Sequence, residues 1–486
     1  MLSTDRLADP TPEAVLIPEP ATRNRVRLTA LIVASALFMQ NLDSTVIATA
    51  LPTMARSFGA DPVHMSVALT AYLLSLAVFI PASGWIADRY GTRTVFRAAI
   101  VVFTLGSILC GRADTLWFLV ASRILQGAGG AMMVPVGRLV LLRTAAKSEL
   151  VAAMAWLSVP ALIGPVLGPP LGGFIVTYFS WRWIFDINVP IGILGVLLVS
   201  LYVEDVREPR ATPFDFRGLV LSAIALCGLL FGLETAGRGV VPISWTEVML
   251  TAGVSACVGY WFHARRHPHP LLDLTLMRLP TFAVSVIAGS LFRIGIGALP
   301  FLLPLMFQVG FGRTAAESGL ITFASSAGAM FMKPGAQFAL RRFGFRTVLT
   351  WNGILSATLL VAVAAFRPSW PVAWIYAVLL ISGFFRSLQF TAYNTLAYAD
   401  IPRERMSAAT SLYATLQQLS LTLGITVGAA VLEFTVVMSG HVRPNAGDFS
   451  AAFLVVAALA FIAGPISLVL PADSGAELSG ARRSSA

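Results

Sequence analysis

Long apolar runs recur along almost the whole chain, and they constrain the fold more than any other feature. From about residue 28 to residue 470 they are separated only by short polar stretches. Each run is long enough for a helix that crosses a hydrocarbon core about 30 Å thick. Hydrophobic residues make up 57% of the chain and charged residues 12%, whereas a soluble protein carries about 25% charged residues. The sequence therefore predicts an all-α polytopic membrane protein.

Fourteen of these runs qualify as predicted transmembrane helices. Their approximate bounds are 28–50, 64–87, 95–111, 115–137, 150–178, 184–203, 217–236, 246–262, 282–308, 316–339, 347–366, 371–398, 407–437 and 451–470. An even number of spans places both termini on the same side of the membrane.

The positive charges indicate which side that is. If the N-terminus is inside, the inner segments hold 23 of the 34 Lys and Arg residues and the outer loops hold 7. Lys and Arg accumulate in cytoplasmic loops, so both termini are expected in the cytoplasm. Residues 1–27 lack the pattern of a signal peptide. We therefore expect a multi-pass protein of the inner (plasma) membrane.

Two short patterns occur twice and indicate an internal duplication. RYGTRTV at 89–95 matches RFGFRTV at 342–348, and RILQ at 123–126 matches RSLQ at 386–389. Such repeats are typical of secondary transporters, which bind substrate near the midplane between the repeats. The predicted fold is two pseudo-symmetric six-helix bundles plus two inserted helices. The expected segments are a cytoplasmic tail at 1–27, a bundle at 28–203, a linker with two helices at 204–281, a bundle at 282–470 and a cytoplasmic tail at 471–486.

Asp43 stands inside the first apolar run, where a charge is costly and usually functional. At 1.5 Å per residue it lies about 10 Å from the outer end of its span, and Arg123 lies about 12 Å from the outer end of the fourth. An ion pair between them is therefore feasible. We expect Asp43 to bind the coupling proton, because burial favours the neutral acid and a nearby arginine favours the carboxylate. The alternatives are a static pair, or an Asp43 held by Asn41, Ser44 or Thr45.

The other charges within spans are unbalanced. Arg293, Lys333 and Arg386 lie within spans of the second half, whereas the acids Asp186, Glu234 and Glu433 lie near outer span ends, where they can meet water. An electropositive lining would favour an anionic substrate; alternatively, the arginines bind carbonyls or packed polar groups. The candidate cavity residues, some of which could instead bridge helices, are Gln126, Arg293, Gln308, Arg386, Gln389, Tyr393, Asn394 and Gln417.

Several motifs resemble those of the major facilitator superfamily, and most of all its fourteen-span drug:proton antiporter family. They are LDSTVIATALP at 42–52, GWIADRYGTR at 84–93, RILQGAG at 123–129, GPVLGPPLGG at 164–173 and WRWIFDINVPIG at 181–192. The resemblance covers nearly all of residues 28–470. It departs from the family pattern in the second half, where Arg341 stands at the position that Asp88 has in the first.

The resemblance implies two further groups of functional residues. A cytoplasmic gate would comprise Gly84, Asp88, Arg89, Gly91 and Arg93. An antiporter motif would comprise Gly164, Pro165, Gly168, Pro169, Gly172 and Gly173. In the second group, glycines and prolines would let helices approach closely and bend. The alternatives are a basic loop with incidental glycines and ordinary small-residue packing.

The leading functional prediction is a proton-coupled antiporter that exports small amphiphilic compounds by alternating access. The alternative is a dedicated exporter of one endogenous metabolite, lipid or siderophore. Neither an ATP-binding pattern nor a hydrolase motif is present, so we expect no enzyme and no cofactor beyond the proton. HARRHPHP at 263–270 reads as a basic connector rather than a metal site. The expected partners are substrate, protons and lipid, not nucleic acid; a monomer is expected, and accessory export proteins stay open.

Overall fold

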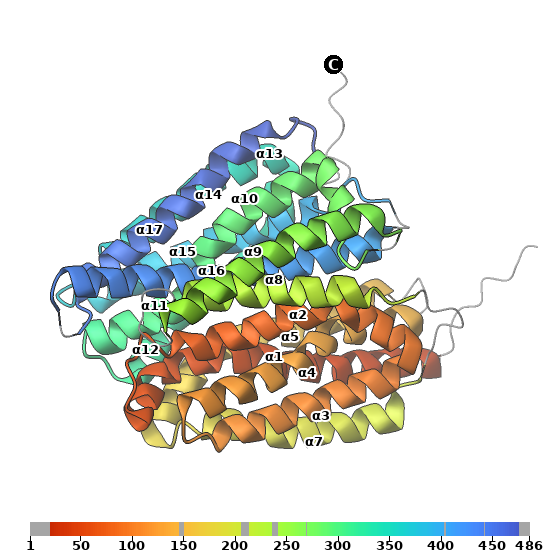
Figure 1. Ribbon diagram of the computed structural model, residues 1–486, viewed down its shortest axis with the longest axis horizontal. Helices are drawn as coiled ribbons and strands as arrows, with labels where there is room; N and C mark the ends of the chain where they lie inside the picture. Colours follow the sequence, from red (N-terminus) through yellow and green to blue (C-terminus); the bar gives the residue numbers. More distant parts are fainter. Residues whose placement is uncertain are drawn as a thin grey trace, which may run out of the picture.

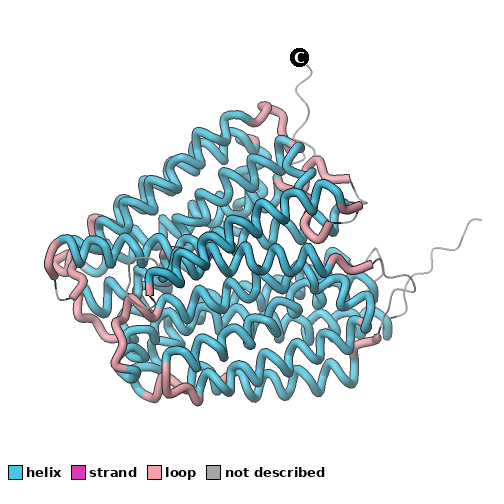
Figure 2. Tube along the Cα trace, in the orientation of Figure 1, coloured by secondary structure: helices cyan, strands magenta, loops and turns pink. Residues whose placement is uncertain are grey.

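In the computed structural model every regular element among the described residues is a helix (Figure 2). The structure describes residues 20–144, 150–205, 213–235, 242–268, 270–402, 405–441 and 443–475. The predicted fold class, an all-α polytopic membrane protein, is thereby confirmed. The predicted terminal tails lie mostly outside the described residues.

The first six predicted spans form helices that we call the first half. They are α1 Pro20–Phe58, α2 Ser66–Tyr90, α3 Thr92–Gly111, α4 Leu116–Thr144, α5 Leu150–Tyr178, α6 Trp183–Asp186 and α7 Asn188–Tyr202. The sixth span is broken at Ile187, between α6 and α7. The first residue of α7, Asn188, is fully buried inside the half.

The two inserted spans and the last six follow in the same order. The inserted helices are α8 Phe216–Thr235 and α9 Ile243–Arg266, followed by the short η1 Leu274–Arg278. The second half comprises α10 Pro280–Gly297, α11 Leu299–Leu305, η2 Met306–Gly310, α12 Ala315–Phe343, α13 Phe345–Thr347, η3 Val348–Asn352, α14 Gly353–Ala364, α15 Val372–Leu396, α16 Met406–Met438, α17 Ala446–Ile466 and η5 Ser467–Val469. Prolines and π-helical turns interrupt the ninth and eleventh spans without reversing the chain.

Among the described residues, 11 helices are long and apolar enough to cross a membrane. Helices α9 and α12 lie where spans are expected but are not among them. Helix α12 carries Glu317, Lys333, Arg341 and Arg342, and α9 ends in a basic turn. The described apolar part of α5, Ile163–Tyr178, is shorter than the others. Composition alone thus undercounts spans that carry several charged side chains, mostly near their ends.

The duplicated pattern makes the same turn in both halves. Gly91 separates α2 from α3 with φ of 92°, and Gly344 separates α12 from α13 with φ of 76°. Both angles lie in the left-handed region, which glycine adopts without a steric penalty. The two turns therefore confirm that the sequence repeat reflects a structural repeat.

The two halves lie side by side, with α8 and α9 along one side of them (Figure 1). We call the end at which α1 begins and α17 ends the tail face, and the opposite end the far face. Two helix pairs join the halves: α5 packs on α12, and α2 packs on α16. Because α12 is the second long helix of its half and α16 the fifth, these pairs exchange under the pseudo-symmetry.

The halves are joined toward the far face and separate toward the tail face. One apolar cluster combines Val46 and Leu51 of α1 with Phe301 and Leu305 of α11. Within the described residues, the cluster around Phe96 holds first-half residues alone, and the cluster around Phe282 holds none of them. In Figure 1, α10, α14 and α17 slope away from the first half toward the side where the C-terminus lies. The conformation is therefore closed at the far face.

Candidate functional site in the first half

Asp43 is the centre of a buried polar cluster between α1, α4 and α7, and its residue is 2% exposed. Arg123 Nη1 donates to Asp43 Oδ2 at 2.6 Å. Oδ1 accepts from Gln126 Nε2 at 2.9 Å and from Asn188 Nδ2 at 2.8 Å. The ion pair inferred from depth is thus present. Ser44 and Thr45 donate to backbone carbonyls instead, so they do not hold the carboxylate.

Arg123 is fully buried and bound on several sides. Its Nη1 also donates to Gln126 Oε1 at 2.7 Å, its Nε donates to the Ala68 carbonyl at 3.4 Å, and its guanidinium lies 4.1 Å from the centroid of the Tyr72 ring. Within the described residues, Arg123 Nη2 and Asn188 Oδ1 have no hydrogen-bond partner. The cluster therefore retains hydrogen-bonding capacity beyond the ion pair.

Asn188 is a site residue that the sequence analysis did not single out. Its Nδ2 donates to Ser107 Oγ at 3.0 Å, and that hydroxyl donates to the Phe185 carbonyl at 2.9 Å. The only sequence signal was the WRWIFDINVPIG segment, in which an amide follows an apolar turn. Asn188 thus connects the Asp43 carboxylate to Ser107 of α3 and, through that hydroxyl, to the junction between α6 and α7.

The glycines of the antiporter motif bring α5 against the Asp43 helix. A Cβ at Gly164 would lie 3.0 Å from the Leu42 nitrogen, and one at Gly172 would lie 2.6 Å from Thr49 Oγ1. A Cβ at Gly168 would clash with Thr45, and one at Gly173 would clash with the Ala315 carbonyl of α12. Helix α5 therefore touches α1 on one face and the second half on another, so it mechanically links Asp43 to the interface between the halves.

The predicted gate residues lie at the α2–α3 turn on the tail face. Asp205, which follows α7, accepts from the Arg93 amide at 3.2 Å, at the N-terminus of α3 where negative charge is favourable. The Arg93 guanidinium donates to the Ser200 carbonyl. A Cβ at Gly91 would clash with Asp205.

These contacts anchor the turn to the end of α7. In addition, Trp85 of α2 packs on Phe214 at 4.6 Å between ring centroids. Around Gly84 a Cβ would meet nothing within 4 Å, Asp88 is half-buried and Arg89 is exposed. That these three residues latch onto the second half stays a prediction.

Arg293 of α10 is the buried arginine of the second half, and it is 1% exposed. Its Nη2 donates to Asn394 Oδ1 at 3.1 Å and to the Tyr413 hydroxyl, and the guanidinium lies 4.8 Å from the centroid of the Tyr413 ring. No carboxylate lies within ion-pairing distance of it in the described part of the chain. Neutral oxygens and aromatic faces therefore stabilise this charge.

Other candidate cavity residues bridge helices. Gln389 accepts from Asn352 Nδ2 at 2.8 Å and donates to the Leu349 carbonyl at 2.8 Å. The Tyr393 hydroxyl lies 3.0 Å from Ser467 Oγ of η5. Gln308 donates to the Thr49 carbonyl at 2.9 Å, across the two halves.

Arg386 and Gln417 are half-buried. Within the described residues, neither side chain forms a hydrogen bond or an ion pair. These two are therefore better placed to meet substrate than the bridging residues. Lys333 is exposed and donates to Thr391 Oγ1 at 3.2 Å.

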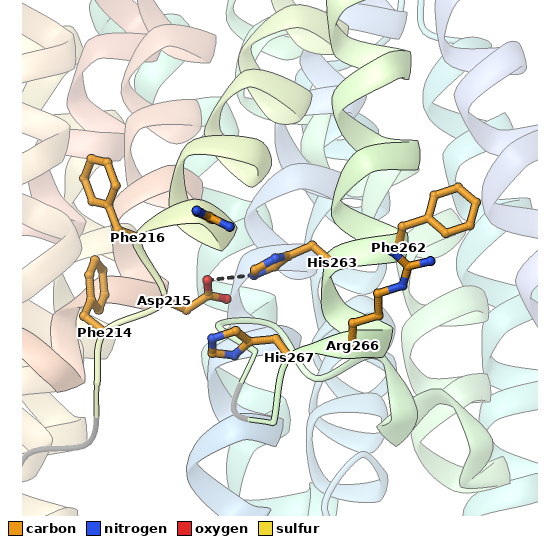
Figure 3. A pocket seen from close by; sticks show the side chains of 8 residues that line it. Phe214, Asp215, Phe216, Phe262, His263, Arg266 and His267 are labelled. Atoms are coloured by element: carbon orange, nitrogen blue, oxygen red, sulfur yellow. Dashed lines mark hydrogen bonds and ion pairs between the residues drawn. The ribbon is translucent and has the colours of Figure 1, made fainter.

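Asp215, His263 and His267 converge at the tail face, where α8 begins and α9 ends (Figure 3). Asp215 Oδ1 accepts from the Gly218 amide at 2.8 Å and lies 2.7 Å from His263 Nε2, and Oδ2 accepts from the Leu271 amide at 3.0 Å. Burial opposes the charge, yet these hydrogen bonds together hold the pKa of Asp215 below its ordinary value. Since the carboxylate is already satisfied and two arginines line the same pocket, the trio acts as a helix junction.

Comparison with known proteins places this site in a family. The model of the Major Facilitator Superfamily matches residues 33–425. A putative multidrug resistance protein MdtD of Serratia proteamaculans (strain 568) is 42% identical over 410 residues, covering 82% of this chain and 84% of the relative. The protein of the same description from Yersinia enterocolitica is 39% identical over 455 residues, covering 92% and 94%.

Solved structures agree on the fold. A POT family transporter in complex with a thioalcohol-conjugated peptide superposes with a TM-score of 0.69 at 14% identity, over 93% of this chain and 96% of that one. A variant of the nucleoside transporter NupG superposes with a TM-score of 0.65 at 13% identity, over 91% and 99%. Since the family model spans most of the sequence, and the relatives match over most of its length, the chain belongs to the Major Facilitator Superfamily.

Proposed function

We propose that the chain is a proton-coupled antiporter that exports small amphiphilic compounds by alternating access. The single observation that carries the proposal is the buried Asp43–Arg123 pair, at 2.6 Å, in the first half. A carboxylate deep in a membrane protein is costly, and proton relays are among the functions that retain one. The relatives described as multidrug resistance proteins support the substrate class.

The geometry suggests how the proton and the conformation are coupled. In the far-face-closed state, three side chains donate hydrogen bonds to Asp43. Movement of α4 or α7 relative to α1 separates the carboxyl group from these donors and changes its surroundings. Because the motif glycines pack α5 on α1 and on α12, rocking of the halves displaces α1. Proton uptake therefore accompanies one conformational change, and proton release accompanies the reverse.

The orientation and assembly belong to the same proposal. The tail face is cytoplasmic, as the positive charges of the loops indicate. Both termini therefore lie on the cytoplasmic side of the inner membrane, and the described conformation is open toward the cytoplasm. The transporter functions as a monomer. A protease-accessibility assay on right-side-out vesicles, with a tag at each terminus, tests the orientation.

Transport in proteoliposomes with an imposed pH gradient tests the coupling. With Asp43→Asn, we expect gradient-driven dye or drug movement to fall to the level without a gradient, while downhill exchange persists. The matched control is Asp114→Asn, since Asp114 is an exposed aspartate that forms a surface ion pair with Arg182. Undiminished gradient-driven transport by the Asp43 variant would refute the proposal.

A dedicated exporter of an endogenous anion is the second candidate, and one observation favours it. Arg293 and Arg386 carry charges for which no carboxylate partner lies among the described residues. A substrate carrying a carboxylate or phosphate could pair with Arg386. If Arg386→Gln selectively abolishes export of organic anions while cationic dyes are never transported, the second candidate is favoured over the first.

A further inference from the structure

Glu234 is a buried acid that the coupling site does not use. It lies in the last turn of the inserted helix α8, near the far face, where the sequence suggested that it could meet water. The structure differs, since the residue is only 2% exposed. The reason is that α8 packs against α2 and α16, and its acidic side chain faces these helices rather than the helix end.

The carboxylate of Glu234 accepts hydrogen bonds from both halves of the molecule. Ser66 Oγ, on the first residue of α2, donates to Oε1. Thr426 Oγ1, on α16, donates to Oε2 at 2.5 Å. Hydrogen bonds to an ionised acceptor are roughly twice as strong as neutral ones. One side chain of an inserted helix therefore fastens a helix of the first half to a helix of the second.

This bridge lies where the halves close on each other. On the same face, the Ala316 amide of α12 donates to Thr177 Oγ1 of α5 at 2.9 Å. His64, in the turn before α2, lies 3.6 Å from Glu433 of α16. A further acid, Glu247, lies in the first turns of α9, which packs on α8. The Glu234 bridge is thus one of several contacts that span the far-face interface.

We propose that Glu234 is a positioning residue of the transport cycle: a clasp, carried by the inserted helices, that holds the far face closed. The inference rests on the proposed alternating access, because opening the far face must part α2 from α16. Parting them breaks at least one of the two hydrogen bonds to Glu234. The strength of the clasp therefore sets the fraction of molecules that open outward.

Labelling of a buried reporter measures that fraction without substrate or a proton gradient. Ser318 lies next to Gly319, whose Cβ position would abut the Pro169 carbonyl of α5, and it is fully buried with no hydrogen-bond partner for its hydroxyl among the described residues. Because Ser318 is fully buried, the variant Ser318→Cys reacts with a thiol reagent only when the packing around α12 opens. Cys227 and Cys257 are replaced, and the protein is held in nanodiscs that expose both faces.

We expect Glu234→Ala to raise the Ser318→Cys labelling rate at least about tenfold, since opening no longer has to break a charge-assisted hydrogen bond to Glu234. Glu234→Gln should give a smaller rise, because it keeps an acceptor but loses the charge. The matched control is Glu247→Ala, an exposed glutamate on the same face, which should not change the rate. Native Cys110, buried in the first half, reports any general loosening and should stay unlabelled.

Two milder variants keep the test decisive if Glu234→Ala does not fold. Ser66→Ala and Thr426→Val each remove one donor and leave the acid in place, so each should raise labelling by a smaller factor. Wild-type labelling in both, or an equal rise at Cys110, would overturn the clasp. Because labelling requires no transport, that outcome would leave the proton-coupling proposal untouched, and failure of proton coupling would leave the labelling result standing.

Discussion

The two halves bury arginines in opposite electrostatic surroundings. In the first half, Arg123 pairs with Asp43 at 2.6 Å. In the second half, Arg293 contacts the Asn394 amide oxygen and the Tyr413 hydroxyl, with no carboxylate in pairing distance among the described residues. Asp43 lies on the first helix of its half and Arg293 on the first helix of the other, so these two helices carry buried charges of opposite sign.

The difference teaches how a symmetric scaffold divides its work. A pair with a titratable member can gain and lose a proton, whereas an arginine, always charged, cannot. In the proposed function the first half therefore carries the coupling group. The second half, with Arg293 held by neutral groups and Arg386 half-buried, carries fixed positive charges. Helix α5 of the first half packs on α12 of the second half, so a movement of one half is passed to the other through this contact.

The largest effect is expected from Arg123→Leu. It leaves the Asp43 carboxylate buried without its cation, a change that typically costs about 3–5 kcal/mol. We expect a marked loss of thermal stability in detergent and no gradient-driven transport. The double variant Asp43→Asn/Arg123→Leu should recover much of the stability but none of the coupling. Equal stability of the single and double variants would contradict the account of the pair.

A change at the fully buried arginine of the second half, Arg293→Leu, should cost less. No acid is stranded, and the lost interactions are hydrogen bonds and aromatic contacts worth about 1–3 kcal/mol together. Proton coupling per transported molecule should persist even if substrate preference changes. Thermal unfolding of the two leucine variants measures the difference in their loss of stability. An Arg293→Leu variant that loses as much stability as Arg123→Leu would contradict the comparison.

Asn188→Ala tests the support around the acid rather than the pair. It removes a donor at 2.8 Å from Asp43 Oδ1. Without this donor Asp43 loses one of the hydrogen bonds that hold its carboxyl group beside Arg123, so gradient-driven transport in proteoliposomes should fall about fivefold, which corresponds to about 1 kcal/mol, while downhill exchange persists. Undiminished gradient-driven transport would exclude Asn188 from the proposed coupling site.

Asp215 tests whether burial alone makes a carboxylate a coupling group. Its pKa is lowered, so its contribution to stability is present above the ordinary aspartate value of about 3.9 and is lost as the pH falls through the lowered folded value. Asp215→Asn should reduce thermal stability slightly, by about 1 kcal/mol. It should also abolish the part of the stability loss at acidic pH that comes from protonation of Asp215. The pH dependence of transport should match wild type; a changed transport profile would make coupling a property of several acids.

Much of the architecture follows from apolar run length and loop charge, since both reflect the membrane rather than tertiary detail. The Asp43–Arg123 pair followed from depth because two charges so far inside a membrane have few alternatives. Asn188 was not predicted, because which face of its helix meets α1 is decided by packing, and the apolar composition of the span does not show that face. The burial of Glu234 was also not predicted, because packing decides which face of α8 meets α2 and α16. Gln389 and Tyr393 are polar residues in apolar spans, which makes them candidates for the cavity. Residues that bridge two helices have the same polarity, so the sequence alone does not distinguish the two roles.

Proton release on substrate binding tests the central claim most directly. Purified protein in weakly buffered detergent solution, with a pH-indicating dye, reports protons that leave when a transported compound binds. The account predicts release by the wild type, none by Asp43→Asn, and wild-type release by Asp114→Asn. Release of the same size from the Asp43 variant, with binding intact, would show that another group carries the proton.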